Sequence, residues 1–360
     1  MRNFKETIEE IFKTNTVTDV SYNGTNLFIQ DNLKGRYRYK EKVDLLEVEN
    51  YIKQLTYENN QKFNDEEPIL DSEYPGLRIN AVHKTLSVSG ITTSIRSSKA
   101  SVKIKDYDTS IAPLKVLKLL EACVRADCNV LISGITGSGK TELQKYLCKV
   151  INDNDKIVLI EDTLDSHLKT LYPNKDIFSW KTNEKVENKI DFDKLIKAAL
   201  RNNPNWIIIS ETRGSEAYSM LKSALSGHNI ITTLHSKGAK NNVERLIHMC
   251  REKYQLDQLL LGNMITDIFD IGIHLDYEID EIGVNRFIVE VVEYVSYDET
   301  GVKCNPIFER EFNIKKRNDK YEYIIDYKYN YISKDLFYKL ASAKILNKEI
   351  DAFINEEYVN

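Results

Sequence analysis

The chain has 360 residues, of which 42% are hydrophobic and 29% are charged, and its formal net charge is -5. This composition is typical of a soluble globular protein, and the length is sufficient for two or three domains with a sizeable core. The acidic balance argues against a protein that coats nucleic acid through bulk positive charge. The five cysteines are scattered and include no Cys-x-x-Cys pair, which argues against a zinc ribbon or a disulfide framework. No apolar run approaches the ~18 residues that a membrane-spanning helix needs.

The first part of the chain, residues 1–107, is predicted to form a small α+β domain. Its N-terminal residues mix acidic and basic side chains, a pattern that favours a helix over a signal peptide. An Asn-Gly pair at residues 23–24 separates two apolar runs, which is typical of a β-hairpin. The expected elements are a helix over 1–14, strands over 17–24 and 26–29, a helix over 43–59, and strands over 77–82 and 91–96. The polar, proline-ended residues 108–113 are predicted to be a linker.

The second part, residues 114–312, contains short apolar runs that alternate with helical patterns. Such alternation favours a parallel sheet that helices cover on both faces. The expected elements are a helix from Leu114, strands over 129–132, 156–160, 206–209 and 229–234, helices over 141–150, 192–202, 215–225 and 255–264, and a strand-rich stretch over 282–312. Residues 313–360 are predicted to be a C-terminal extension that ends in a helix from Ser333.

The most informative segment is Gly-Ile-Thr-Gly-Ser-Gly-Lys-Thr at residues 134–141, which fits the phosphate-binding pattern GxxxxGK[ST]. Its glycines allow the backbone to turn tightly and to point N–H groups at phosphate oxygens. Lys140 has the charge and the reach for the β- and γ-phosphates, and the Thr141 hydroxyl can ligate Mg²⁺. A predicted strand precedes the loop and a predicted helix follows it, as the motif requires. The sequence therefore predicts a nucleoside triphosphate site, with ATP and Mg²⁺ as its ligands.

Polar side chains follow three of the predicted strands at the points where these strands end. Glu161 follows the strand over 156–160, Glu211 follows the strand over 206–209, and His235 follows the strand over 229–234. Ligands of open parallel sheets lie beyond the carboxyl ends of the strands, so these residues are expected near Lys140. ATP hydrolysis needs a carboxylate for Mg²⁺, a group that positions the attacking water and a contact to the γ-phosphate. Either glutamate alone would also fit a solvated strand end.

Together these segments resemble the secretion ATPases, the hexameric traffic ATPases of type II and type IV secretion and of type IV pili. That family has a Walker A loop, an acidic Asp box, a Walker B strand and a His box. The corresponding segments here follow in the same order, at residues 134–141, 160–163, 209–217 and 226–235. A weaker resemblance to the sensor-like N-terminal domain of the tight-adherence pilus branch involves residues 17–24, 78–81 and 94–96. The resemblance implies an α/β fold: a RecA-like P-loop NTPase domain with a mostly parallel sheet, preceded by a small α+β domain.

The resemblance also implies a role for each matching residue. The loop residues implied to bind the nucleotide are Gly134, Thr136, Gly137, Ser138, Gly139, Lys140, Thr141 and Glu142. Thr141 and Glu211 would hold Mg²⁺, Glu161 is the candidate to activate water, and His235 would sense the γ-phosphate. The further residues implied to reach the nucleotide are His228, Arg213, Arg78 and Arg96, with Arg201 as an additional arginine. Both Arg201 and Arg213 could act across a subunit boundary. Which of the two glutamates is the base stays open, and His228 would equally fit a structural role.

Four departures from the family pattern indicate a divergent branch. Ser210 replaces the usual glycine before the Walker B glutamate, and Glu142 follows the loop where a second threonine is common. The Asp box continues as Leu-Asp at 164–165, and the His box has Asn-Ile at 229–230 in place of proline-glycine. A tetracysteine zinc motif, common in type II secretion and pilus-extension members, is missing from the sequence, which disfavours those branches.

The implied function is that of a cytoplasmic homohexameric ATPase that powers type IV secretion, conjugation or tight-adherence pilus assembly. Its implied partners are other copies of the chain and inner-membrane platform or channel proteins, with peripheral contact at the cytoplasmic face of the membrane left open. The basic segment 315–320 could contact a partner or anionic lipid, or could be a solvated loop. A RecA-like nucleic-acid translocase is one alternative, although the acidic balance disfavours it and no stable nucleic-acid binding is expected. A nucleotide-gated scaffold without turnover is the other alternative.

Overall fold

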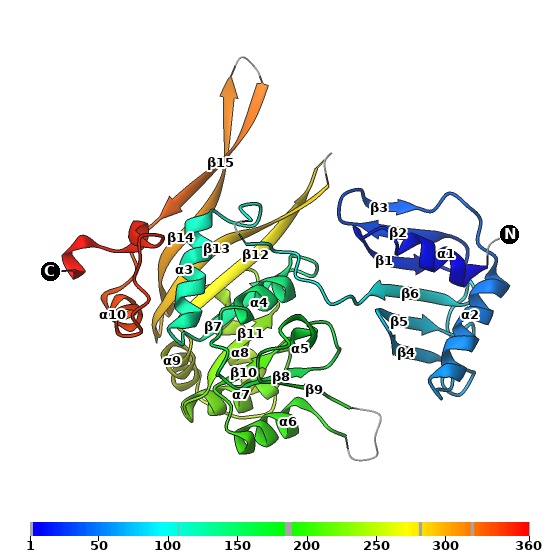
Figure 1. Ribbon diagram of the computed structural model, residues 1–360, viewed down its shortest axis with the longest axis horizontal. Helices are drawn as coiled ribbons and strands as arrows, with labels where there is room; N and C mark the ends of the chain where they lie inside the picture. The colour runs from blue at the N-terminus through cyan, green and yellow to red at the C-terminus, as the bar shows by residue number, and fades with distance from the viewer. Residues whose placement is uncertain (1–2, 107, 184–188, 281–282, 318–319, 360) are drawn as a thin grey trace. The chain divides into compact units, whose positions relative to one another are not determined.

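The computed structural model describes residues 3–106, 108–183, 189–280, 283–317 and 320–359. The chain divides into two compact units, residues 1–100 with 278–285 and residues 101–277 with 286–360 (Figure 1). Within the described ranges, no helix has both the length and the apolar character that crossing a bilayer requires.

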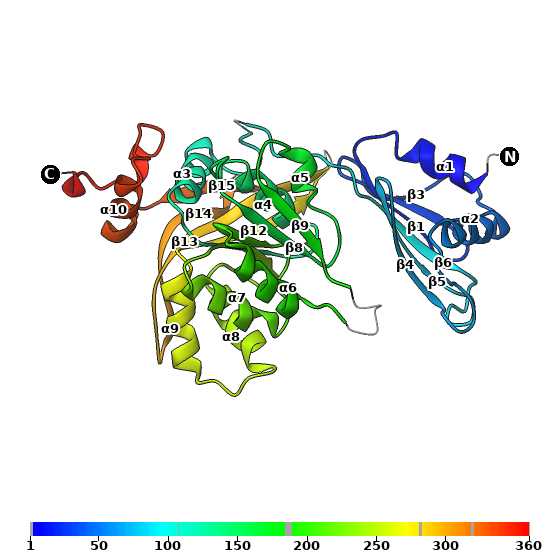
Figure 2. The ribbon, with the colours of Figure 1, turned by 60° about the horizontal axis from the view of Figure 1, so that its bottom comes forward.

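The first unit is an antiparallel sheet with two helices on one face (Figure 2). Its strands lie in the order β3-β2-β1-β6-β5-β4. Phe4 and Ile8 of the first helix and Val48 and Ile52 of the second are buried in one hydrophobic cluster with strand residues. The predicted Asn-Gly turn is present, and Gly24 adopts the positive φ of +93° that glycine permits. The elements are α1 Phe4–Ile11, β1 Val17–Tyr22, β2 Leu27–Asp31, β3 Gly35–Arg38, α2 Leu45–Glu58, β4 Ile69–Tyr74, β5 Leu77–Val82 and β6 Thr92–Ser97.

The second unit is an α/β domain on a larger sheet, with strands in the order β15-β14-β13-β12-β7-β11-β10-β8-β9. The strands from β12 to β9 in this order are parallel, whereas β13 to β15 form antiparallel pairs with one another. The strands are β7 Val130–Gly134, β8 Ile157–Glu161, β9 Ile177–Lys181, β10 Trp206–Ile209, β11 Asn229–Leu234, β12 Ile271–Ile279, β13 Val284–Asp298, β14 Gly301–Arg317 and β15 Lys320–Tyr329. The helices are α3 Leu114–Arg125, α4 Lys140–Cys148, α5 Leu168–Leu171, α6 Phe192–Ala199, α7 Glu216–Leu225, α8 Asn241–Arg251, α9 Gln258–Ile268 and α10 Lys334–Ser342.

The larger sheet separates two hydrophobic cores. Successive side chains of a strand point to opposite faces, so each central strand contributes to both cores. Ile157 and Leu159 of β8 join the core that includes α3, α4 and α10, whereas Val158 and Ile160 join the core that includes α6 to α9. The apolar runs in the sequence are continuous because both faces of these strands are covered. Full burial of each such side chain stabilises the fold by about 1.5–3 kcal/mol relative to exposure.

The register of the parallel strands brings their carboxyl ends to one edge of the sheet. Ile209 of β10 lies beside Ile160 of β8 and beside Thr232 of β11. Leu234 of β11 lies beside Ser133 of β7, the strand that leads into the glycine-rich loop. The segments that follow β7, β8, β10 and β11 therefore begin at nearly the same level.

The structure places the domain boundaries differently from the sequence. Ile111 and Ala112, in the predicted linker 108–113, are buried in the core of the second unit, and Pro113 is the N-cap residue of α3. The predicted extension 313–360 is also part of this unit, because β14 and β15 continue the sheet and Leu340 of α10 is buried in the core. A short polar stretch with one proline thus marks the start of a helix here, and not a boundary between two units.

Candidate nucleotide site

The glycine-rich loop joins β7 to α4 and depends on the backbone freedom of glycine. Gly134, Gly137 and Gly139 have φ values of +155°, +84° and +98°, a region that other residues rarely adopt. A Cβ atom added to Gly134 would lie 2.4 Å from the Leu275 carbonyl oxygen of β12 and 2.4 Å from Ser138 Oγ. Position 134 therefore accepts only glycine unless β12 or Ser138 moves.

Lys140, the first residue of α4, lies inside this loop with only 8% of its surface exposed. Its Nζ donates to the carbonyl oxygens of Gly134 at 3.0 Å and Ile135 at 3.1 Å, and it lies 3.4 Å from His235 Nδ1. Burial lowers the pKa of Lys140 to about 8, although the negative charge of Glu211 acts in the opposite direction. The ammonium group is thus poorly solvated and held by neutral carbonyls, so an anionic phosphate would be a stronger partner.

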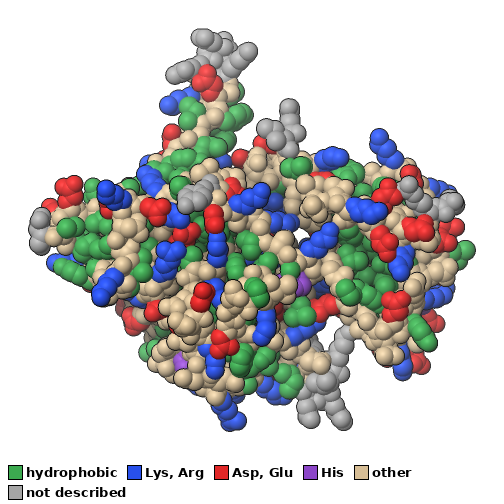
Figure 3. Space-filling model, in the orientation of Figure 1, with side chains coloured by type: hydrophobic (Ala, Val, Ile, Leu, Met, Phe, Trp, Pro, Cys, Tyr) green, Lys and Arg blue, Asp and Glu red, His purple; other side chains and the backbone are tan. Residues whose placement is uncertain are grey.

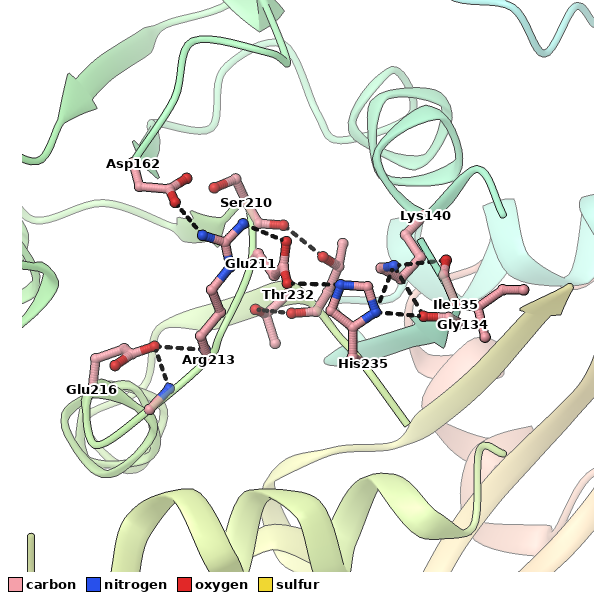
Figure 4. A network of polar contacts seen from close by, with 12 residues as sticks. Gly134, Ile135, Lys140, Asp162, Ser210, Glu211, Arg213, Glu216, Thr232 and His235 are labelled. Carbon is pink, nitrogen blue, oxygen red and sulfur yellow. Dashed lines mark hydrogen bonds and ion pairs between the residues drawn. The ribbon is translucent and has the colours of Figure 1, made fainter. Parts of the chain in front are cut away.

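A chain of ion pairs and hydrogen bonds runs from Lys140 across the ends of three strands (Figure 4). His235 Nδ1 lies 3.0 Å from the Gly134 carbonyl oxygen, and its Nε2 lies 3.1 Å from Glu211 Oε1. The other oxygen of Glu211 accepts a hydrogen bond of 2.9 Å from Arg213, whose second terminal nitrogen lies 2.5 Å from Asp162 Oδ2. The predicted residues Lys140, Glu211, His235 and Arg213 are therefore brought together at the carboxyl edge.

The environment of Glu211 keeps its carboxylate ionised. Burial alone would raise the pKa of Glu211, but the hydrogen bond and charge of Arg213, together with His235 and Lys140, lower it below its ordinary value. An ionised carboxylate near the lysine of a phosphate-binding loop is the state that an Mg²⁺ site requires.

Glu161 is in a different state. It is 1% exposed, and its Oε1 accepts hydrogen bonds from the Ser166 backbone N–H at 3.0 Å and from the Ser166 hydroxyl at 2.6 Å. Burial raises the pKa of Glu161, although the hydrogen bonds from Ser166 act against this shift. In this conformation the contacts of its carboxylate are with the segment that follows β8, and it does not belong to the chain of contacts in Figure 4.

Hydrogen bonds from neighbouring side chains fix the strand ends that carry these groups. Gln144 of α4 donates to the Ile209 carbonyl oxygen at 2.9 Å and to the Ile231 carbonyl oxygen at 3.3 Å. Thr233 Oγ1 donates to the Ser210 carbonyl oxygen at 2.7 Å. The helix after the loop is therefore tied to β10 and β11, the two strands that precede Glu211 and His235.

The remaining loop residues differ in their contacts. Thr136 is exposed, and Thr141 is half-buried in the first turn of α4. Glu142 is engaged away from the loop, because its carboxylate accepts from Lys145 Nζ at 3.0 Å and from the Lys103 backbone N–H at 2.8 Å. Ser138 Oγ is buried and has no hydrogen-bond partner among the described residues.

These residues fit a nucleotide phosphate with Mg²⁺. Among the described residues the buried Ser138 hydroxyl has no hydrogen-bond partner, the ammonium group of Lys140 donates to neutral carbonyl oxygens, and α4 begins within the loop, where backbone N–H groups attract negative charge. The described residues include no group of three or more His, Cys, Asp or Glu side chains that could hold a metal ion. A magnesium site here would thus combine Thr141 and Glu211 with phosphate oxygens and water, which is the usual composition of such sites.

Two of the predicted residues lie apart from this chain of contacts. His228 precedes β11 at its amino end, whereas His235 follows its carboxyl end, so the six strand residues separate them. Both ring nitrogens of His228 are buried without a hydrogen-bond partner in the described part of the chain. Arg201 is exposed in a short 3-10 helix that follows α6.

Arg78 and Arg96 lie opposite each other on β5 and β6 of the first unit. Arg96 Nε lies 2.7 Å from Asp19 Oδ1, and Arg78 Nε lies 3.7 Å from Asp71 Oδ1. The side chain of Arg96 is half exposed and that of Arg78 is about one third exposed. The antiparallel register thus places the two predicted arginines side by side on one face of the sheet.

Sequence reasoning missed two residues of the site. Asp162 joins the chain of contacts through Arg213, and its signal was its position directly after Glu161 at a strand end. Arg286 of β13 donates from Nε to the Gly137 carbonyl oxygen at 2.7 Å, and burial lowers the pKa of its guanidinium. Arg286 had no signal in the sequence, because it follows the loop by almost 150 residues and only the sheet topology brings it near.

Comparison with known proteins identifies the family. A family model described as "Type II/IV secretion system protein" matches residues 8–269. An uncharacterized protein of Bacillus anthracis is 34% identical over 327 residues, which cover 88% of this chain and 72% of that protein. The type IV secretion system protein VirB11 of Brucella suis is 26% identical over 270 residues, which cover 64% of this chain and 72% of that protein.

A solved structure gives the fold independently. The X-ray structure of the Yersinia pseudotuberculosis ATPase DotB aligns with a TM-score of 0.60 at 18% identity, covering 81% of this chain and 78% of that chain. At this identity the likeness shows the fold alone, and it confirms the predicted α/β fold, a RecA-like domain preceded by a small N-terminal domain. Since the family model matches well over half of the chain, the protein belongs to the type II/IV secretion system protein family.

Proposed function

We propose that the protein hydrolyses ATP with Mg²⁺, and that hydrolysis powers a type IV secretion, conjugation or tight-adherence pilus machine from the cytoplasmic side of the membrane. The observation that carries the enzymatic part is the chain of contacts from Lys140 through His235 and Glu211 to Arg213 and Asp162. This chain of contacts connects the phosphate-binding loop with the ends of β8, β10 and β11. Loss of the γ-phosphate would therefore change contacts at all three strand ends.

Each residue of the site has a distinct chemical role in this proposal. Lys140 exchanges the carbonyl oxygens of its own loop for phosphate oxygens, and the loop N–H groups bind the same anion. Bound Mg²⁺ would neutralise charge on the phosphates, with Thr141 and Glu211 as its protein ligands. His235 lies between Lys140 and Glu211, which is where a γ-phosphate contact is needed.

Two carboxylates compete for the role of the base that activates water. Glu211 is ionised and lies in the chain of contacts, whereas Glu161 is buried on Ser166 and would have to change rotamer to reach a water at the phosphate. We infer that Glu211 is the better placed of the two in this conformation, and that Glu161 reaches a water only after a rearrangement of the segment over residues 162–166.

The assembly state and the partners form the second part of the proposal. The chain would act as a homohexamer, with Arg78 and Arg96 reaching the nucleotide from the N-terminal unit and Arg201 or Arg213 acting across a subunit boundary. The movement that ATP hydrolysis drives in the hexamer would be transmitted to inner-membrane platform or channel proteins. Membership of the type II/IV secretion family and the relation to a type IV secretion protein support this part.

The test is to measure ATP binding and phosphate release separately in the native protein and in two variants. Lys140→Ala is expected to weaken binding, whereas Glu211→Gln is expected to retain binding and to lose about 10²-fold or more in turnover, because only the charge of the carboxylate is removed. Tight ATP binding by the native protein with no phosphate release would instead favour a nucleotide-gated scaffold. A rate that rises strongly with single-stranded DNA or RNA would favour a nucleic-acid translocase.

A further inference from the structure

The β14–β15 hairpin projects from the sheet of the second unit (Figure 1). β13 pairs with β14 from Gly301 to Glu309, and β14 pairs with β15 from Phe308 to Arg317. The outer part of the hairpin, between Arg310 and Tyr327, lies beyond the residues of β14 that pair with β13. The family model matches residues 8–269 and so does not include this hairpin.

The two faces of the outer hairpin differ sharply in chemistry. Alternate residues of a strand point to the same face, and cross-strand partners share a face. Phe312 pairs with Ile325, Ile314 with Tyr323, and Lys316 with Tyr321. One face, here called the aromatic face, is made up of Phe312, Ile314, Tyr321, Tyr323, Ile325 and Tyr327. The opposite face is made up mainly of polar and charged residues, namely Glu311, Asn313, Lys315, Glu322, Ile324, Asp326 and Lys328.

The aromatic face is exposed along its whole length. Its six side chains are between 41% and 68% exposed, with Tyr323 the most exposed and Ile325 the least. Hydrophobic side chains gather along the shaft of the projecting hairpin (Figure 3). Monomeric soluble proteins rarely expose a contiguous apolar surface of this kind without a binding role.

Charge is distributed unequally over the two faces. The cations Arg310 and Lys316 belong to the aromatic side, with Arg310 over the Phe287 ring and Lys316 over the Tyr321 ring. The acids lie on the opposite side, where Glu311 pairs with Lys328 and Asp326 accepts from Asn313. Lys315 lies on the opposite face with these acids, whereas Asn318 and Asp319 lie outside the described residues. The aromatic side therefore complements a negatively charged partner.

We propose that the aromatic face docks on the surface of a membrane that contains anionic lipids. Tyrosine rings favour the membrane–water interface, and nearby Lys and Arg side chains are attracted to anionic headgroups. Phe312 and Tyr323 stack on each other, and Ile314 and Ile325 beside them offer no π surface for stacking, which favours lipid over a strand of bases. A flat bilayer also meets only one face, so the acidic residues Glu311, Glu322 and Asp326 stay in water on the other side.

The test uses vesicles and a matched pair of variants. The native protein is expected to sediment with vesicles that contain phosphatidylglycerol and not with vesicles of phosphatidylcholine alone. The double variant Phe312→Ser/Tyr323→Ser removes two stacked rings from the aromatic face and is expected to lower the partition coefficient by about tenfold or more. Ile324→Ser removes an apolar side chain from the opposite face of the same strand and is expected to leave partitioning unchanged. Equal melting temperatures and ATPase rates of the variants show that the fold is retained.

A second pair of variants measures directly whether the aromatic face enters the vesicle membrane. Tyr323→Trp is expected to give an emission shift to the blue on anionic vesicles, and Ile324→Trp is expected to give none. Partitioning that the double variant does not change would overturn the proposal. The proposal would also be overturned if the protein did not bind vesicles and the aromatic face instead bound a single-stranded oligonucleotide. The same holds if the protein did not bind vesicles and the aromatic face instead drove self-association that the double variant abolishes. Because vesicle binding needs no turnover, its failure is distinguishable from failure of the ATPase proposal.

Discussion

Lys140 is the residue whose protonation decides whether the loop is ready for an anion. Its ammonium group is buried among backbone carbonyls, and burial lowers its pKa to about 8. A lysine with an ordinary pKa would remain charged well above this pH. The charge of the site therefore changes within a pH range that a binding experiment can reach.

The first prediction follows from this pKa. Below about pH 8 Lys140 carries its proton before nucleotide arrives, whereas above that pH binding must take up a proton. The binding constant of a non-hydrolysable ATP analogue is therefore expected to fall above pH 8, by up to about tenfold per pH unit. Titration calorimetry between pH 7 and pH 9.5 measures this, with Lys140→Ala as the control that lacks the inflection. An inflection that persists in Lys140→Ala would assign the titration to another group.

Glu161 gives a prediction on stability. Because burial raises its pKa, the fold favours the protonated acid, and the stability that it contributes is present at low pH and is lost as pH rises through the folded pKa. Glu161→Gln cannot ionise and can still accept the Ser166 hydrogen bonds. The variant is expected to lose less stability than the native protein between about pH 5 and about pH 8. Parallel unfolding curves for the two proteins across this range would contradict a buried, charge-sensitive Glu161.

Arg286 gives a prediction on the loop. Arg286→Ala removes the hydrogen bond to the Gly137 carbonyl oxygen, which is worth about 0.5–1.5 kcal/mol. If that bond holds the loop in its binding shape, nucleotide affinity should fall by about two- to tenfold. Arg245→Ala, which removes an exposed arginine of α8, is the matched control. Equal affinities of the two variants would leave Arg286 without a role in the loop.

At the scale of elements, the C-terminal residues form part of the core of the second unit. Leu340 of α10 is fully buried in the same core as residues of α3 and α4. Leu340→Ala is expected to destabilise the protein by about 2–5 kcal/mol, since the cavity adds to the lost transfer free energy. Leu260→Ala, at a leucine that is 62% exposed, is expected to change stability by less than about 1 kcal/mol. Similar unfolding midpoints for the two variants would mean that α10 is dispensable for the fold.

The strands β7, β8, β10 and β11 could be predicted from sequence, whereas β12, which lies beside β7, and the edges of the sheets could not. β10 and β11 begin and end where their apolar runs do, because both faces are covered and the run itself marks the strand. β9 and β4 escaped prediction because they are edge strands with partly exposed, mixed patterns. The helix predicted over 255–264 begins and ends later, at Gln258–Ile268, because Asp257 caps it and accepts from the Leu260 N–H.

The same reasoning explains what the sequence revealed of the site. Lys140, Glu211 and His235 each follow a strand whose end the sequence predicts, so the rule for open parallel sheets was sufficient to bring them together. At the end of β8 successive side chains point to opposite sides, so Glu161 is buried against Ser166 whereas Asp162 contacts Arg213. The position of Arg286 depends on the pairing of distant strands, which no local pattern encodes.

At the scale of the whole molecule, the proposal requires more than one copy of the chain. Arg201 is exposed, and His228 lies at the opposite end of β11 from Lys140 and its contacts. Neither residue joins these contacts within its own unit. The ring nitrogens of His228 are buried, so of the two it is the exposed Arg201 that is available to a neighbouring subunit. The sharing of sites between subunits is therefore the central claim about how the protein works.

The most direct test measures phosphate release per subunit as the protein concentration rises, alone and with increasing amounts of Lys140→Ala protein mixed in. A ring with shared sites predicts a specific activity that climbs with concentration and falls more steeply than the native fraction when the variant is added, because one inactive copy disturbs its neighbours. A specific activity that is constant with concentration and falls in proportion to the native fraction would contradict the account and would assign any hydrolysis to independent subunits.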